Sequence, residues 1–238
     1  ANNRFDFRII SKLLHVIRNF EINFEWCRQL DSTVLKHFGK SLPYLTTVKS
    51  LALKFSDTPE MRNKDIKNIA SNISNLKKLE NLSIRFKECR EITNKGVSFL
   101  FNEIATVKNL ISLKATLNME NLKDSGITSV SNALTHLEGL QRLSISLAHS
   151  QVTDEGLNCL SLSIGELKNL KSLNFSLTNL ENISDKSLEI IGTKISNLDL
   201  HNLKLKVTSC EKITDAGYQS MTNNLRLIPS LQKIGRAS

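Results

Sequence analysis

The chain has 238 residues, of which 37 are Leu and 24 are Asn, and its formal net charge is +9. With 40% apolar residues and charges along its whole length, it has the composition of a folded protein and not of a disordered one. No apolar stretch reaches the roughly 18 residues of a membrane-spanning helix, so we predict no membrane partner, and a chain of this length needs no disulfide or metal to fold.

The chain opens with an apolar pattern within residues 1–13, at Phe5, Phe7, Ile9 and Ile10, which is typical of a helix from a preceding repeat. After it, one apolar position recurs every 30 or 31 residues, at Phe20, Leu51, Leu82, Leu113, Leu143, Leu173, Leu203 and Ile234. A turn motif that begins at Ile92 keeps the same spacing, from Leu122, Val152, Ile183 and Ile213, and more weakly from Leu30 and Met61. Two independent patterns that stay in phase predict about seven structural repeats.

Each repeat changes its hydrophobic rhythm halfway. Residues 82–86 alternate apolar and polar side chains, which indicates a short strand with one buried face. From Val97 to Val107 the apolar residues fall on one helical face. Such a unit cannot bury its own apolar face, so we expect an α/β solenoid, a horseshoe with a parallel sheet on its concave face and helices on its convex face.

The residues of one repeat resemble a known family. The run Leu79-x-x-Leu82-x-Ile84-x-Phe86-x-x-Cys89-x-x-Ile92-Thr93-Asn94-x-Gly96-Val97 is similar to the leucine-rich repeat, in its ribonuclease-inhibitor-like and cysteine-containing subtypes. The segments 151–157 and 212–217 match the I-T-D-x-G-L part of the cysteine-containing subtype. The resemblance implies a solenoid that binds other proteins.

We interpret residues 1–238 as a single solenoid domain. Its first residues carry the apolar pattern of a helix, and its last, Gly235 to Ser238, fall where an eighth strand begins. Because a solenoid needs polar end caps to be soluble alone, we expect a segment of a longer array, or a subunit of a large complex whose ends are covered by partners.

The cysteines are predicted to be packing residues. Cys27, Cys89 and Cys210 share one turn position in repeats 1, 3 and 7. At a strand spacing of about 4.8 Å, the first two lie roughly 10 Å apart, beyond the ~7 Å limit for a disulfide. With Cys159 on a helix face, we expect four buried free thiols and a reducing intracellular compartment, for which the cytoplasm, a cilium and the cytoskeleton are the candidates.

The repeated carboxylates are predicted to be structural. Asp124, Asp154, Asp185 and Asp215 recur once per repeat at a helix start, where such residues cap exposed amides, whereas catalysis by paired carboxyls needs two that converge on one substrate. The five His residues have no partner at a triad spacing, and Gly occurs singly. We therefore predict no enzyme, no catalytic residue, no metal and no cofactor.

The candidate binding surface is the concave face. Polar residues between the apolar strand positions form rows across successive repeats, and two basic clusters appear in them. The first is Lys54, Arg85, Lys87 and Lys114, and the second is Lys204 and Lys206, with Arg142 at the edge of the Ser-, Thr- and Asn-rich surface between them. Glu21 and Glu25 make the first repeat acidic.

These rows favour a protein partner with an acidic surface, since a positive field attracts acidic molecules. Nucleic acid is a weaker candidate, because the rows have no aromatic side chain on which bases could stack, although phosphate contacts remain open. The favoured function is a non-catalytic protein-protein interaction scaffold within a larger assembly. The resemblance leaves two alternatives: the substrate-recognition arm of an F-box type ubiquitin ligase, and a Ran-type GTPase activator.

Overall fold

The computed structural model describes residues 16–228 and 233–236 of the chain. These residues form one sheet in which strand order equals chain order and every neighbouring pair is parallel. The strands are β1 (Asn19–Asn23), β2 (Ser50–Ser56), β3 (Asn81–Lys87), β4 (Ser112–Asn118), β5 (Arg142–Ser146), β6 (Ser172–Thr178), β7 (Asn202–Thr208) and β8 (Lys233–Arg236).

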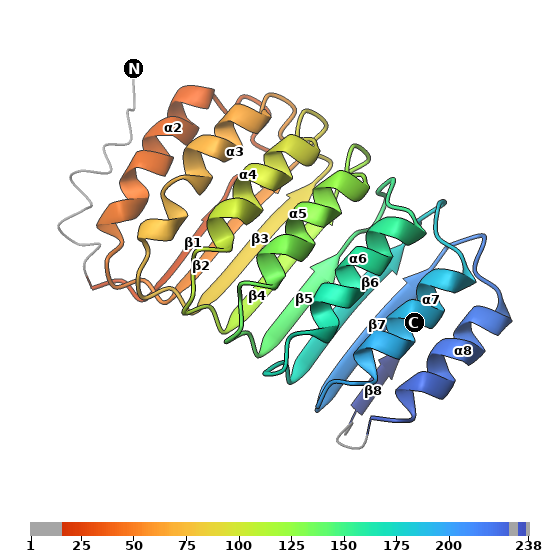
Figure 1. The fold of residues 1–238 in the computed structure, drawn as a ribbon. Helices are drawn as coiled ribbons and strands as arrows, with labels where there is room; N and C mark the ends of the chain where they lie inside the picture. Colours follow the sequence, from red (N-terminus) through yellow and green to blue (C-terminus); the bar gives the residue numbers. More distant parts are fainter. Residues whose placement is uncertain (1–15, 229–232, 237–238) are drawn as a thin grey trace.

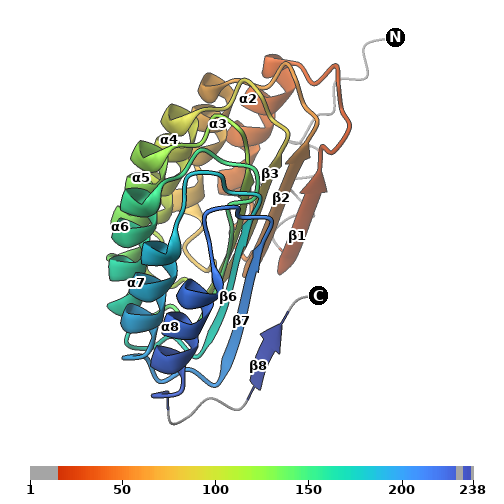
Figure 2. The same cartoon turned by 90° about the vertical axis from the view of Figure 1, so that its right-hand side faces the viewer.

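A helix follows each strand from β1 to β7 and returns the chain to the start of the next strand (Figure 1). The helices are α2 (Ser32–Ser41), α3 (Asn63–Ala70), α4 (Asn94–Ile104), α5 (Asp124–Leu134), α6 (Asp154–Gly165), α7 (Asp185–Ile195) and α8 (Asp215–Leu225), with short 3-10 turns at Leu42–Tyr44 and Ile73–Asn75. The helices form one layer and the sheet the other, on the inner side of the arc (Figure 2). The predicted α/β solenoid with a parallel sheet is confirmed.

The strand register confirms the apolar pattern found in the sequence. Phe20 pairs with Leu51, Leu51 with Leu82, and the series continues through every strand to Leu203 and Ile234. Because side chains alternate between the faces of a strand, this register places one Leu column against the helices. We call each strand with its following helix a coil and number the coils 1 to 7.

The core lies between the two layers and runs along the whole array. Leu51, Leu143 and Leu173 are at most 2% exposed. In the first coils a stack of aromatic rings adds to it, with 5.4 Å between the centroids of Phe24 and Phe55 and 5.5 Å between those of Phe55 and Phe86. The stacked rings therefore pack coils 1, 2 and 3 against one another.

Apolar side chains of the outer coils are less buried. Phe20 and Ile22 of β1, and Leu205 and Val207 of β7, are only partly buried, whereas their counterparts in the central coils are fully buried. The helix predicted at residues 1–13 lies outside the described residues. Within the part of the chain that the structure describes, no helix is long and apolar enough to cross a membrane.

A side-chain ladder joins the helix starts of neighbouring coils. The Asp124 carboxylate accepts hydrogen bonds from the backbone N–H and the hydroxyl of Thr153 in the next coil, at 2.8 and 2.6 Å. Asp154 accepts in the same way from Ser184, and Asp185 from Thr214. The prediction that these Asp residues cap their own helices is therefore wrong. In coils 3, 5 and 7 a Thr hydroxyl caps the helix instead, as in α6, where Thr153 accepts from the N–H of Glu155.

The ladder explains why a Gly stands two positions after the Asp or Asn at the helix start in most coils. A Cβ on Gly156 would lie 2.2 Å from Oδ1 of Asp124, and a Cβ on Gly217 would lie 2.3 Å from Oδ1 of Asp185. In coil 6 the position is Ser187, whose hydroxyl donates to the Asp154 carboxylate. The Gly thus makes room for the ladder carboxylate of the preceding coil.

Six strand exits turn through a left-handed residue that is not Gly. The φ angles lie between 48° and 65°, and the residues are Trp26, Asp57, Glu88, His149, Asn179 and Ser209. All of these residues except Ser209 donate a backbone N–H hydrogen bond to a carbonyl of the next coil. Asp57, for example, donates to the carbonyl of Lys87 at 3.0 Å. Met119 of coil 4 is the exception, since its N–H turns back to Leu117 and the Asn118 side chain accepts from Ala148 instead.

The cysteines differ from the prediction in their burial. All four are free, and Cys89 and Cys210 are buried as expected, but Cys27 is exposed and Cys159 is half-buried. Cys89 lies 3.3 Å from the Thr58 hydroxyl, and burial raises the pKa of its thiol although that contact opposes the shift. Cys27 is exposed because it stands in the first coil, where the turn has no neighbour among the described residues on its outer side.

Candidate partner-binding face

The predicted rows of polar residues exist on the sheet. Residues Ala52, Ser83, Lys114, Ser144, Asn174 and Lys204 are successive register partners, and so are Lys54, Arg85, Thr116, Ser146, Ser176 and Lys206. These side chains alternate with the buried Leu column, so they point away from the helices. The structure therefore places the predicted basic residues of β2, β3, β4 and β7 on one face.

The N-terminal half of this face is neutralised within the chain. Nζ of Lys54 lies 2.5 Å from Oε1 of Glu21, and Nη1 of Arg85 lies 3.3 Å from Oε1 of Glu25. The Lys54 and Arg85 charges therefore already face carboxylates of the first coil. The sequence indicates that the first coil is acidic. It does not indicate that the carboxylates of this coil reach the neighbouring cations, because the paired residues lie diagonally across the sheet and at different sequence spacings.

Glu25 is held as a carboxylate by its neighbours. Burial raises its pKa, but hydrogen bonds from Ser56 and Asn23 and the Arg85 guanidinium outweigh burial, so the pKa of Glu25 lies below its usual range. The Ser56 hydroxyl donates to it at 3.1 Å. The charged form of Glu25 thus fixes Arg85 from the side of β1.

Lys87 and Arg142 form no pair with the carboxylates of the first coil. Lys87 is exposed at the end of β3, where Nζ lies 3.2 Å from a carboxylate oxygen of its neighbour Glu88. Arg142, at the start of β5, donates a hydrogen bond to the side-chain oxygen of Asn81 on β3 at 3.2 Å. Its guanidinium therefore crosses β4 and keeps its positive charge.

Three cations on the same face keep no acidic partner. Lys114 and Lys204 are exposed and Lys206 is half-buried, and no ion pair joins any of them to another residue in the described part of the chain. The four strands from β4 to β7 contain no Asp or Glu. The uncompensated positive charge thus lies over β4 to β7, and Lys114 is the one member of the first predicted cluster that belongs to it, because Lys54, Arg85 and Lys87 face carboxylates.

Small polar side chains separate these cations. Apart from Arg142 at the start of β5, the outward positions of β5 and β6 are held by Ser144, Ser146, Ser172, Asn174, Ser176 and Thr178. They give hydroxyl and amide groups and no bulky side chain. The surface between Lys114 and Lys204 is therefore a low polar floor.

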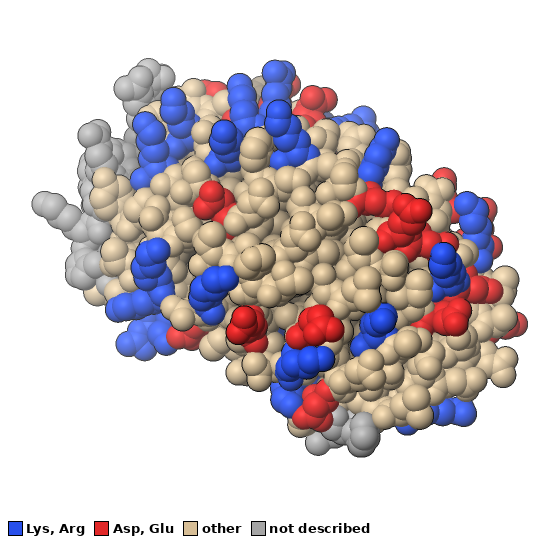
Figure 3. All heavy atoms as spheres, in the orientation of Figure 1, with Lys and Arg blue, Asp and Glu red and all other residues tan. Residues whose placement is uncertain are grey.

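Figure 3 shows the face seen in Figure 1, on which acidic and basic side chains both lie near the borders and uncharged residues cover much of the surface. Lys49 and Glu80 form one of the ion pairs, with 2.5 Å between Nζ and Oε1. The side of the molecule that carries the helices thus has charges of both signs.

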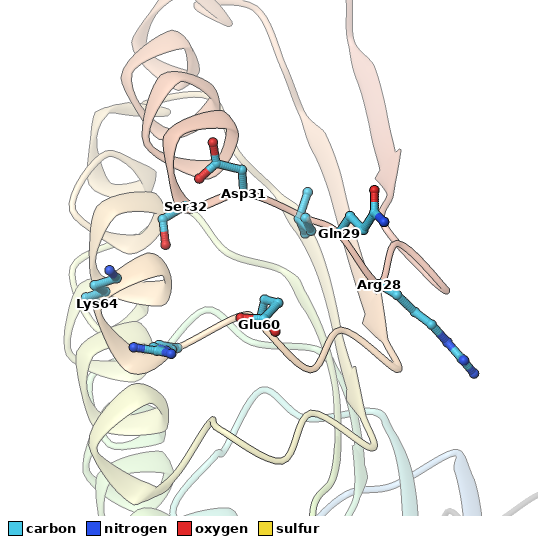
Figure 4. Close-up of a pocket in the computed structure, with 8 residues that line it drawn as sticks. Arg28, Gln29, Asp31, Ser32, Glu60 and Lys64 are labelled. Atoms are coloured by element: carbon cyan, nitrogen blue, oxygen red, sulfur yellow. The ribbon is translucent and has the colours of Figure 1, made fainter.

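A hollow of about 510 Å³ lies at the helix starts of coils 1 and 2, lined by Arg28, Gln29, Leu30, Asp31, Ser32, Glu60, Arg62 and Lys64. In Figure 4 the Arg28 side chain extends away from Asp31 and Ser32, and its Nη2 lies 3.0 Å from the Asp57 carboxylate. The Asn and Asp ladder lacks a rung here, because the N–H of Arg62 donates to Asp65 in its own helix. Since the lining carries both signs of charge, we assign this hollow no ligand.

The residues described by the structure show no metal-binding cluster, as no three His, Cys, Asp or Glu side chains come together. His149 contacts the Asn179 amide of the next coil at 3.0 Å. The chemistry of the concave face is therefore that of charge and hydrogen bonding.

No protein-family model and no curated protein sequence matches the chain. Among solved structures it is similar to the tropomodulin C-terminal domain of Caenorhabditis elegans, with a TM-score of 0.48 and 12% identity over 68% of this chain and 93% of that chain. It is also similar to actin-binding site 2 of leiomodin-1, with a TM-score of 0.47 and 14% identity over 83% of this chain and 90% of that chain. It is also similar to a chain in the crystal structure of the yeast Rad7 and Elc1 complex, with a TM-score of 0.45 and 18% identity over 92% of this chain and 58% of that chain.

The class of fold follows from the repeat and the sheet. A period of 30 or 31 residues, a Leu column in register and a parallel sheet covered by helices on its outer side define an α/β solenoid.

Proposed function

We propose that this chain is a non-catalytic protein-protein interaction scaffold within a larger assembly, and that its concave face binds an acidic surface of a protein partner. The observation that carries the proposal is the set of cations without acidic partners on β4 to β7, Lys114, Arg142, Lys204 and Lys206, above strands that contain no carboxylate. Lys54, Arg85 and Lys87 play a smaller part in this proposal, since carboxylates of the chain face them.

An unpaired cation binds a partner carboxylate without first losing one of its own. Lys54 has its carboxylate already, so a partner would have to compete with Glu21. Lys114 and Lys204 exchange only water for a partner carboxylate, and an exposed pair of that kind contributes up to about 1 kcal/mol. Several such pairs on one face give selectivity for acidic partners and a fast association.

Two finer assignments belong to the same proposal. The T-D-x-G turns support the ribonuclease-inhibitor-like or cysteine-containing subtype of the repeat, and the buried Cys89 and Cys210 support a reducing compartment. The ubiquitin-ligase, GTPase-activator and nucleic-acid alternatives stay predictions, as no contact of the described residues favours them.

Charge reversal tests the proposal. A variant with Lys114→Glu, Lys204→Glu and Lys206→Glu is compared with wild type in pull-downs from native cell extract, quantified by mass spectrometry. We expect acidic proteins captured by wild type to be lost from the variant. The matched control, Glu21→Lys with Lys54→Glu, keeps the net charge and swaps an internal pair, so it retains the same proteins. Identical captures by wild type and the triple variant refute the proposal.

A further inference from the structure

Cations stand on both sides of the polar floor on β5 and β6, and we call this floor with its two borders the trough. Lys114 on β4 stands on one side, together with the guanidinium of Arg142, which reaches back across β4 to Asn81. Lys204 and Lys206 on β7 stand on the other side. We call these two pairs the β4 wall and the β7 wall.

The dimensions of the trough suit one kind of secondary structure. Three strand spacings separate β4 from β7, which is about 14 Å. An α-helix with its side chains is about 10–12 Å across. Strand β6 has seven residues, or roughly 23 Å of length, which corresponds to about 15 residues of helix.

The chemistry of the floor restricts the face of that helix. Ser144, Ser146, Asn174 and Ser176 offer hydroxyl and amide groups and no apolar anchor. The helix residues that touch the floor must therefore be small or polar. The walls are cationic, so the residues on both flanks of the helix must be acidic.

Resting on the proposed function, we propose that the partner contributes an acidic α-helix that lies in this trough, parallel to β5 and β6, with carboxylates on both flanks. Successive helix residues are 100° apart, so the residues just before and after a floor position point to opposite walls. The recognised pattern is a small residue between two acidic ones, repeated about every seven residues.

An extended segment does not meet both walls in this way. Its side chains alternate between the two faces of the strand. With one face on the floor, its carboxylates would point at the floor or into solvent. The trough floor also has no aromatic side chain on which an unpaired base could stack, which disfavours single-stranded nucleic acid.

Binding of designed peptides to the full chain tests the proposal by fluorescence anisotropy. The two-flank peptide is an 18-residue, Ala-rich helix with Glu-Ala-Glu repeated every seven residues. The one-flank peptide is an isomer with the same Glu residues along a single flank and equal helicity by circular dichroism. We expect the two-flank peptide to bind on the order of tenfold more tightly, since only it pairs with both walls.

Variants assign the effect to the walls. Lys114→Gln and Lys204→Gln should each weaken the two-flank peptide several-fold, and the double variant should remove its advantage over the isomer. Glu21→Gln with Lys54→Gln, which removes an internal pair, should leave both affinities unchanged.

Three results overturn the inference. Equal affinities for the two isomers reject the helix in the trough but leave the proposed function standing, provided that a folded acidic protein or polyglutamate still binds in a Lys114- and Lys204-dependent way. A single-stranded oligonucleotide that binds more tightly than the two-flank peptide rejects it in favour of nucleic acid. Failure of every acidic probe rejects the proposed function as well.

Discussion

Gly156 shows how one residue depends on the coil before it. Its α-carbon faces the Asp124 carboxylate, and the space for a methyl group is already occupied by Oδ1 at 2.2 Å from the ideal Cβ position. Gly139, in an exposed turn, has no atom within 3.8 Å of its ideal Cβ position. The two glycines therefore form a matched pair.

We expect Gly156→Ala to lower the free energy of unfolding by about 1–3 kcal/mol, the usual cost of overpacking. Urea denaturation followed by circular dichroism measures it, with Gly139→Ala as the control that changes little. Asp124→Ala in the same chain should reduce the cost of Gly156→Ala, because the clash is with its carboxylate. Additive effects of the two substitutions would contradict the ladder geometry.

The ladder carboxylates make folding sensitive to acid. Burial raises the pKa of Asp154, but hydrogen bonds from Ser187 and Ser184 and the charge of Lys186 outweigh it, so the pKa lies below its usual range. Hydrogen bonds from Thr214 lower the pKa of Asp185. A pKa that is lower in the folded state gives stability that is present above the unfolded value, near pH 4, and is lost as the pH falls through the folded value.

We therefore expect the urea midpoint to fall as the pH drops below about 4, and to fall less steeply in Asp154→Asn. Asn serves at the same ladder position in coil 2, where Asn63 accepts from the N–H of Thr93 at 3.0 Å, so the variant should fold. Glu138→Gln, on an exposed turn, is the control. Parallel pH profiles for wild type and Asp154→Asn would contradict the assigned role of this carboxylate.

The cysteines should differ in reactivity. Cys27 is exposed, whereas burial raises the pKa of both the Cys89 and the Cys210 thiol. Because the thiolate is the reactive form, we expect a thiol reagent such as iodoacetamide to label Cys27 first in the native protein. Peptide mass spectrometry over time measures the order, and faster labelling of Cys89 than of Cys27 would show that coil 3 is open.

At the scale of the element, the buried strand positions and the outward ones play separate parts. Leu143 of β5 is 2% exposed, and its truncation to Ala should cost about 2–5 kcal/mol of unfolding free energy. Lys114→Gln on the outward face of β4 should change stability by less than about 0.5 kcal/mol. Similar losses from both, measured by urea denaturation, would mean that the assignment of the strand faces is wrong.

The strand and helix pattern could be predicted because both depend on local periodicity. Every Leu column partner from Phe20 to Ile234 has the expected neighbour in the sheet. The ladder could not be predicted, because a carboxylate at a helix start has the same local signature whether it caps its own helix or binds the next coil. Asp124 and Thr153 meet only after stacking.

The candidate site could be predicted only in part for a related reason. The rows follow from the repeat, and in the sheet Lys114, Ser144, Asn174 and Lys204 are successive register partners. Which cations are paired depends on side chains that reach diagonally between strands, as Lys54 does to Glu21. The sequence spacing alone does not indicate such a pair.

For the whole molecule, the division of charge on the concave face matters more than the net charge of +9. Lys54 of β2 and Arg85 of β3 face carboxylates from coil 1, whereas Lys114 of β4 and Lys204 and Lys206 of β7 form no ion pair among the described residues. Binding through exposed charges is screened by salt. We therefore expect affinity for an acidic partner to fall steeply with ionic strength, and a titration from low to physiological salt measures it.

Lysine footprinting shows which cations meet an acidic chain. The native protein is acetylated at a low reagent concentration, alone and with polyglutamate, and the rate at each Lys is read by peptide mass spectrometry. We expect polyglutamate to protect Lys114, Lys204 and Lys206, and the rate at Lys54, which is already paired with Glu21, to change little. Protection spread evenly over all lysines, or centred on those of the helix layer, would contradict this prediction.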